Sequence, residues 1–170
     1  VAYFSYIDGV NTIITEASLF ATAIGIQMAQ LLTILLFVQI VAFPASIMFG
    51  HLAKSVGERL MIIIGIIIYI VIAIMSVFIT HAWGFWVMAF LIGSAQGGIQ
   101  ALSRSYFGKI IPKAFAGEFF GFYNIFGKFS AVLGPLLFGS VAAITGQVQL
   151  GAASLLIFFV LGGWIFIKYA

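Results

Sequence analysis

The sequence contains no cysteine, only three prolines and very few charged side chains. Without cysteine there is no disulfide, no thiolate metal ligand and no thiol nucleophile. Charged residues make up 6% of the 170 residues and hydrophobic residues 64%, whereas about a quarter of a soluble domain is charged. So small a charged fraction cannot cover a water-facing surface, which excludes a soluble globular protein.

Residue patterns typical of enzymes and nucleic-acid-binding proteins are also missing. His51 and His81 lack the HExxH pattern of zinc hydrolases, and neither a phosphate-binding glycine loop nor a GxSxG motif occurs. The net charge of +3 comes from basic residues dispersed among apolar runs, unlike the clustered charge that binds a phosphate backbone. We therefore expect no catalysis, metal, cofactor or nucleic-acid partner.

Apolar runs of about 20 residues, the length that crosses a bilayer as an α-helix, recur along the chain. Strand-like alternation does not extend over long windows, so the spans are predicted to be helices rather than barrel strands. The sequence thus predicts an all-α polytopic membrane protein with a single domain covering residues 1–170. The six predicted spans are residues 2–24, 31–52, 60–80, 82–104, 118–143 and 149–168.

Lysine and arginine are distributed unevenly between the two sides of this arrangement. They flank spans two and four and the end of span six, and the alternate connections hold none. Because positive residues favour the cytoplasmic side, both termini and the connections 53–59 and 105–117 are predicted to be cytoplasmic. The residues concerned are Lys54, Arg59, Arg104, Lys109, Lys113 and Lys168. Since Val1 already lies in an apolar run, we expect the chain to be part of a longer polypeptide.

A polar stripe runs along the first predicted span. Asp8, Asn11, Thr12 and Glu16 fall at helical spacings of three, four and eight and therefore share one face of a helix. A carboxylate at the bilayer centre costs about 2.5–3.5 kcal/mol. Asp8 and Glu16 thus need water, a partner or a proton, and we expect this face to meet a cavity or another polar helix rather than lipid.

The predicted partner is Lys128, the cation within span five, with Asn124 one turn before it on the same face. We expect Lys128 to pair with Asp8 or Glu16, because an isolated ammonium group inside the membrane is costly. The pair either locks spans one and five together or belongs to a site that binds substrate or exchanges a proton.

Span four combines small and amide side chains. Gly93 and Gly97 form a small-xxx-small pair, which indicates close packing between helices. Gln96 and Gln100 lie one turn apart, and their amides need polar partners in the membrane. The sequence leaves open whether they line the same cavity as the polar stripe.

The connection after span two resembles the GxLaDrxGrr loop signature of the major facilitator superfamily, through Gly50, Lys54, Gly57 and Arg59. In that superfamily the loop joins the second and third helices of each six-helix half. Lys54 stands where the signature has aspartate, and Glu58 where it often has a basic residue. The charge relay of the loop therefore does not transfer to this sequence.

Longer stretches, residues 6–12, 97–105 and 118–139, are similar to one family, that of the fungal vacuolar amino-acid effluxers and related bacterial permeases. The third stretch contains the Gly134-Pro135 pair typical of the fifth helix in this superfamily. The resemblance implies the C-terminal six-helix half of a twelve-span permease that moves a small solute, such as an amino acid, by alternating access. It also implies a second six-helix half as partner and, in a bacterium, the inner membrane as location.

Two other interpretations remain open. Two copies of the chain could assemble into a half-size carrier or pore, in which case no other polypeptide is needed. Alternatively, the chain is a membrane scaffold whose polar stripe only holds helices together.

Overall fold

The computed structural model describes residues 2–169, apart from the side chains of Ala114, Phe126, Phe129 and Ser130. Within these residues the chain is almost entirely helical and contains no strand, so the all-α prediction is confirmed. The elements are α1 (Ala2–Ala23), α2 (Met28–Val56), α3 (Glu58–Ser76), α4 (Ala82–Ile110), η1 (Lys113–Phe115), α5 (Ala116–Thr145), α6 (Val148–Ser154) and α7 (Leu156–Tyr169).

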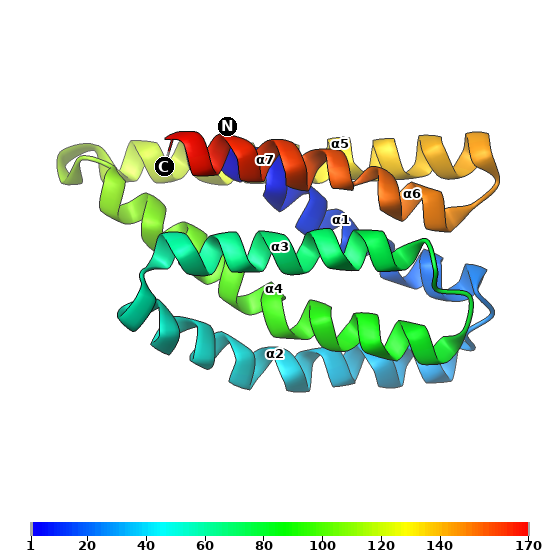
Figure 1. Cartoon of the computed structure of the whole chain (residues 1–170). Helices are drawn as coiled ribbons and strands as arrows, with labels where there is room; N and C mark the ends of the chain where they lie inside the picture. The colour runs from blue at the N-terminus through cyan, green and yellow to red at the C-terminus, as the bar shows by residue number, and fades with distance from the viewer. Residues whose placement is uncertain (1, 170) are drawn as a thin grey trace.

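The long helices lie lengthwise beside one another (Figure 1). Helices α5 and α7 run along one side of the bundle and α2 along the other, with α1, α3 and α4 between them. Both termini lie toward the end that holds the α2–α3 and α4–α5 connections. The basic residues of those connections are therefore gathered at one end of the bundle, whereas the side of the membrane that this end faces remains a prediction.

Four helical stretches in the described residues are long and apolar enough to cross a membrane: α2, α3, α4 and Val148–Tyr169. The other two predicted spans form α1 and α5, with 22 and 30 residues. Polar side chains lower the mean hydropathy of α1, and the apolar part of α5 is the shorter stretch Ala131–Thr145. Both helices are long enough at about 1.5 Å per residue to span the roughly 30 Å of hydrocarbon.

Two helices extend into the predicted connections at residues 53–59 and 105–117. Helix α2 continues to Val56, so that only Gly57 separates it from α3. Gly57 has a φ of +94°, a conformation that glycine adopts without the steric cost of a side chain. Helix α4 continues to Ile110, two residues before Pro112. Charged side chains alone did not end either helix, whereas glycine and proline did.

The last predicted span, residues 149–168, is divided at Leu155 into α6 and α7. At the break, the Leu155 N–H donates to the carbonyl of Ala152 and the Phe158 N–H to that of Leu155. These shorter-range bonds replace the regular helical pattern over one turn. Helices α2 and α5, in contrast, continue through Pro44 and Pro135.

Helix α1 lies at the centre of the packing and contacts α5 and α7 most extensively. On the α7 side, a Cβ at Gly9 would lie 2.7 Å from the Phe159 ring, which fills that space. Phe159 in turn stacks on Tyr69 of α3 with ring centroids 5.5 Å apart. This face of α1 is therefore fixed by apolar packing, and its polar residues are directed to the remaining sides.

Candidate functional site

The polar stripe of α1 divides between several neighbours. Asp8 and Thr12 are fully buried where α1 meets α5. Asn11 lines a groove between α1 and α4, and Glu16 borders a separate apolar pocket. A stripe about 140° wide is broad enough that its two edges face different helices in a packed bundle.

Asp8 binds the backbone of α5 directly. The Gly134 N–H donates to Asp8 Oδ1 at 2.9 Å, and Asp8 Oδ2 is buried without a hydrogen-bond partner. A Cβ at Gly134 would lie 2.7 Å from Asp8 Oδ1 and would collide with the Thr12 hydroxyl. The two helices thus touch through backbone and short polar side chains, at a position that only glycine can occupy.

The predicted ion pair between Lys128 and a carboxylate of α1 is not present. Lys128 and Asn124 are exposed on α5, and the ion pair found among the described residues joins Lys109 to Glu58 instead. Lys128 precedes Gly134 by six residues, or about 9 Å along a helix. The part of α5 that reaches Asp8 is consequently its Gly134-Pro135 step and not the region of its cation.

A polar groove with a volume of about 340 Å³ lies between α1 and α4. It is lined by Tyr3, Ile7, Asn11, Gly97, Gln100, Ala101 and Arg104. The side chains of Arg104 and Gln100 are exposed and Asn11 is half-buried. Amide, phenol and guanidinium groups therefore converge on one accessible surface, as in sites that orient a small polar ligand.

Arg104 and Tyr3 belong to this groove although the sequence did not single them out as site residues. The position of Arg104 at the end of the amide-rich stretch of span four was the available signal. Tyr3 stacks on Tyr123 of α5, with centroids 4.1 Å apart, so α5 supports one edge of the groove. Nothing in the spacing of these aromatic residues predicted that contact.

Gln96 lines a second groove, of about 440 Å³, together with Gln39 of α2 and Ile14 of α1. Gln96 Oε1 is buried without a hydrogen-bond partner. Gln100 and Gln96 therefore face two neighbouring grooves along α4 rather than one cavity. Gly93 faces α2 closely, since a Cβ there would lie 2.9 Å from the carbonyl oxygen of Val38.

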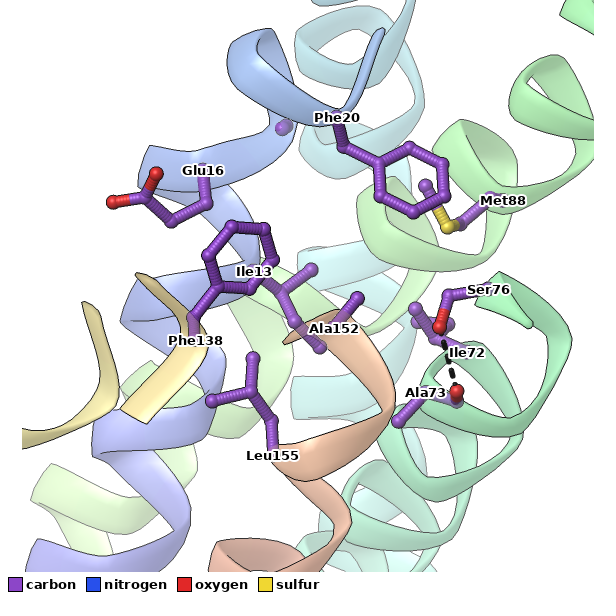
Figure 2. A pocket seen from close by; sticks show the side chains of 11 residues that line it. Ile13, Glu16, Phe20, Ile72, Ala73, Ser76, Met88, Phe138, Ala152 and Leu155 are labelled. Carbon is purple, nitrogen blue, oxygen red and sulfur yellow. Dashed lines mark hydrogen bonds between the residues drawn. The ribbon is translucent and has the colours of Figure 1, made fainter. Parts of the chain in front are cut away.

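Glu16 lies at the border of a small pocket lined almost wholly by apolar side chains (Figure 2). The volume of this pocket is only about 20 Å³, close to the space that one water molecule needs. In Figure 2 the Glu16 carboxylate points away from Phe20 and Met88 on the far side of the pocket. This pocket is too small and too apolar for a polar solute.

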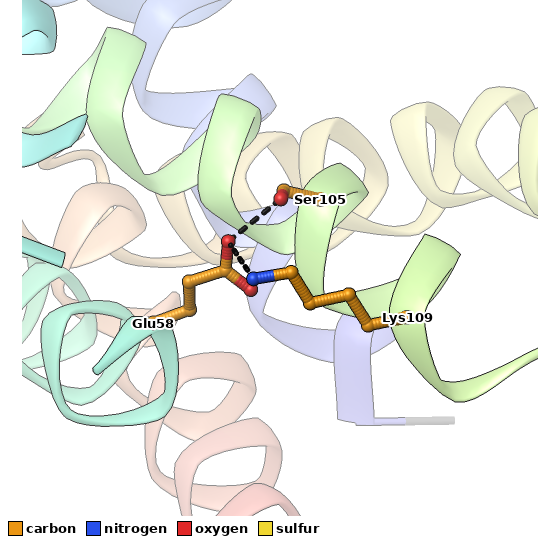
Figure 3. A network of polar contacts seen from close by, with 3 residues as sticks. All are labelled: Glu58, Ser105 and Lys109. Atoms are coloured by element: carbon orange, nitrogen blue, oxygen red, sulfur yellow. Dashed lines mark hydrogen bonds and ion pairs between the residues drawn. The ribbon is translucent and has the colours of Figure 1, made fainter. Parts of the chain in front are cut away.

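The end of the bundle near the loop signature is held by a polar network (Figure 3). Glu58 Oε1 accepts a hydrogen bond from Ser105 Oγ at 2.7 Å and pairs with Lys109 Nζ at 3.0 Å. Burial of the Glu58 carboxyl acts to raise its pKa, but these hydrogen bonds and the charge of Lys109 outweigh it and hold the pKa below its ordinary value. Arg59 donates to the carbonyl of Ile167 at 2.7 Å and so joins α3 to α7.

The loop signature itself has a structural role at Gly57 and a polar contact at Arg59. Lys54 is exposed, and the space around Gly50 is open, with no atom within 4 Å of a Cβ built there. The network in Figure 3 uses Glu58, which departs from the signature, rather than Lys54.

Comparison with known proteins identifies the family. The family model described as "Vacuole effluxer Atg22 like" matches residues 1–169. The chain belongs to this family. It is 48% identical over 161 residues to the uncharacterized MFS-type transporter YxiO of Bacillus subtilis, covering 95% of this chain and 38% of that protein.

Fungal members of the Atg22-like family are more distant. Autophagy-related protein 22 of Vanderwaltozyma polyspora is 30% identical over 165 residues, or 88% of this chain and 31% of the relative. The Kluyveromyces lactis protein of the same name is 26% identical over 175 residues, or 94% and 35%. The chain thus spans about a third of the length of these relatives. Family membership and the apolar helices together identify an integral membrane protein of the major facilitator type.

Proposed function

We propose that the chain is one six-helix half of a secondary active transporter that moves a small polar solute by alternating access. The observation that carries this proposal is the groove between α1 and α4, in which Asn11, Gln100 and Arg104 converge on an accessible surface. In transporters built from repeats, solute sites lie at the interface between the repeats near the middle of the membrane. The groove would form one wall of such a site.

Amino acids are the proposed solutes. The Arg104 guanidinium group can donate two parallel hydrogen bonds to a carboxylate, and the amides of Asn11 and Gln100 can donate to and accept from polar groups. The described groove residues include no carboxylate, which favours a ligand with an anionic group. The names of the family and of the bacterial relative, a vacuole effluxer and an MFS-type transporter, support transport as the activity.

The proposed partners are a second six-helix half, the lipid bilayer and the solute. A second half fits the observation that the chain covers 38% of its bacterial relative. The α2–α3 and α4–α5 connections, which carry or adjoin most of the basic residues, lie at one end of the bundle. This supports a cytoplasmic location for both termini. The bacterial relative makes the inner membrane the proposed location.

Solute exchange in lipid vesicles tests the proposal. We expect vesicles that hold the chain together with the segment preceding it in the same reading frame to exchange radiolabelled amino acids, and Arg104→Gln to reduce exchange about tenfold or more. Lys113→Gln removes a cation from η1, outside the groove, and should leave exchange unchanged. Exchange by the chain alone as a dimer would favour a half-size carrier. No exchange of any solute in either preparation would favour a scaffold.

A further inference from the structure

The Asp8 carboxyl is a buried acidic group with one oxygen that has no hydrogen-bond partner. It is fully buried, its Oδ1 accepts one hydrogen bond from Gly134, and its Oδ2 has no partner. Thr12 cannot serve it, because the Thr12 hydroxyl already donates to the backbone carbonyl of Asp8 at 2.7 Å. An ionised carboxylate would leave its charge unbalanced in this dry contact.

No charged group compensates Asp8 from the helices that pack on α1. The carboxyl group has a single hydrogen bond in the described structure, that from Gly134, and no ion pair. Among the described side chains, α6 carries no titratable group. The titratable groups of the other helices packed on α1 are His51 and Lys54 of α2, Arg104, Tyr106 and Lys109 of α4, Glu118, Tyr123 and Lys128 of α5, and Lys168 and Tyr169 of α7, with Tyr3, Tyr6 and Glu16 on α1 itself.

The backbone that Asp8 contacts belongs to the Gly134-Pro135 step of α5, where the helical hydrogen bonds are interrupted. Pro135 follows Gly134 and has no N–H, so one carbonyl of the preceding turn lacks its helical donor. Helices of membrane proteins tolerate such a step when neighbouring groups satisfy the backbone. The Asp8 carboxyl is therefore placed where a change in its charge acts on two helices at once.

We propose that Asp8 is a proton-binding site whose occupancy decides how closely α1 and α5 pack, and so couples a proton to the movement of α1 beside the solute groove. This inference rests on the proposed function. Uptake adds one proton from water to Oδ2 and gives a neutral carboxyl, while Oδ1 keeps the Gly134 hydrogen bond. Release returns the proton to water and leaves a carboxylate.

The closed joint of this structure suits the neutral carboxyl, and the ionised form requires water. A carboxylate left in such surroundings is costly, so release favours separation of α1 from α5 and entry of solvent. Asn11 lies three residues from Asp8 and faces the groove. Movement of α1 therefore changes the groove, and proton and solute must influence each other's binding to the same extent.

Titration of Asp8 is measurable without any mutation, because Asp8 is the single aspartate of the sequence. Aspartate labelled with ¹³C at its carboxyl carbon gives one side-chain signal for the chain in lipid vesicles. We expect the chemical shift of this signal to change from that of a neutral carboxyl to that of a carboxylate as the pH is raised. The signal should disappear in Asp8→Asn and persist in Glu16→Gln, the matched control on the same helix. A carboxylate shift at every pH overturns the proposal.

The coupling to helix packing has its own test. Because the chain lacks cysteine, Thr15→Cys on α1 and Leu133→Cys on α5 place two spin labels at exposed positions. We expect the distance between the labels to lengthen as Asp8 releases its proton, and to remain short at every pH in Asp8→Asn, whose amide oxygen can still accept from Gly134. If Asp8→Asn does not fold, the labelled chain with native Asp8 is sufficient for the test. A distance between the labels that stays constant while Asp8 titrates overturns the coupling.

These measurements separate the inference from the proposed function, because neither requires transport. A chain that titrates at Asp8 and opens its α1–α5 joint but exchanges no solute contradicts the transport proposal alone. A chain that exchanges solute while Asp8 stays ionised contradicts the proton site alone. A shift that follows sodium ion at constant pH, without any change with pH, also overturns the proton site.

Discussion

The two polar sides of α1 differ in how they use the same kinds of side chain. Toward α5, Asp8 and Thr12 are fully buried against Gly134 with no room for another atom. Toward α4, Asn11 faces a groove of about 340 Å³ together with exposed Gln100 and Arg104. The first side is a dry joint and the second an open surface.

This difference teaches that polarity along a helix does not by itself identify a binding surface. In the contact between α1 and α5, a larger side chain collides with backbone and buried oxygens, so the free energy of unfolding is sensitive to side-chain size. In the groove, side chains end in open space, so substitutions alter the chemistry offered to a ligand and leave the packing intact. The predictions below test whether stability and function separate between these two sides.

The largest expected effect is on stability, from Gly134→Val. The new side chain would occupy the space of the Thr12 hydroxyl and the Asp8 carboxyl. Overpacking of this kind typically costs about 1–3 kcal/mol, measurable as a lower thermal unfolding temperature in detergent. Gly139→Val is the matched control, because no atom lies within 4 Å of a Cβ at Gly139 on the same helix. Equal losses at the two positions would contradict the dry joint.

On the groove side we expect function to change and stability to remain. Arg104→Gln should alter the free energy of unfolding by no more than about 0.5 kcal/mol, as for most surface substitutions. Solute binding should weaken by about 1.5–3 kcal/mol, the usual contribution of a hydrogen bond to a charged group. Unfolding and solute exchange measured on the same preparation decide this, and a large loss of stability would make Arg104 a packing residue instead.

A moderate effect is expected at the border between the groove and the core. Ser103 Oγ donates to the carbonyl of Ile99 at 2.6 Å, so the Tyr6 hydroxyl must donate to Ser103 Oγ, at 2.7 Å. Tyr6→Phe removes this buried bond and should cost about 0.5–1.5 kcal/mol. Thermal unfolding of Tyr6→Phe, Ser103→Ala and the double variant gives the coupling energy. Additive losses would show that the bond contributes nothing of its own.

The smallest effect is expected in the network of Figure 3, which joins α3 to α4. Because the pKa of Glu58 is lowered in the folded state, the pair with Lys109 adds stability above the ordinary value of 4.5, and this contribution is lost as the pH falls through the lower folded-state value. Lys109 is 68% exposed, so the pair contributes less than about 1 kcal/mol. Unfolding temperatures measured against pH for the native chain and Glu58→Gln should converge at acid pH. Parallel curves would contradict this role.

Several features followed from residue patterns because they depend on local physics. Long apolar runs and sparse charge predicted helices and a membrane location, and the stretches at residues 6–12, 97–105 and 118–139 indicated the family before the comparison established it. The divided span at Leu155 and the extension of α4 to Ile110 were missed. Helix ends depend on backbone hydrogen bonds and on packing with other helices, which apolar periodicity does not report.

In the candidate site, too, one part followed from the sequence and another did not, and helix α1 shows both. The sequence by itself determined that α1 carries Asp8, Asn11, Thr12 and Glu16 on one broad face, because helical geometry fixes their relative angles. It also indicated that Asp8 needs compensation within the membrane. Only the tertiary structure decided that Asp8 meets Gly134 and not Lys128, and that Asn11 joins Arg104 at a groove. Helix rotation and axial position depend on which side chains fit together across the bundle, and glycine at position 134 allowed the approach that a charge pattern could not specify.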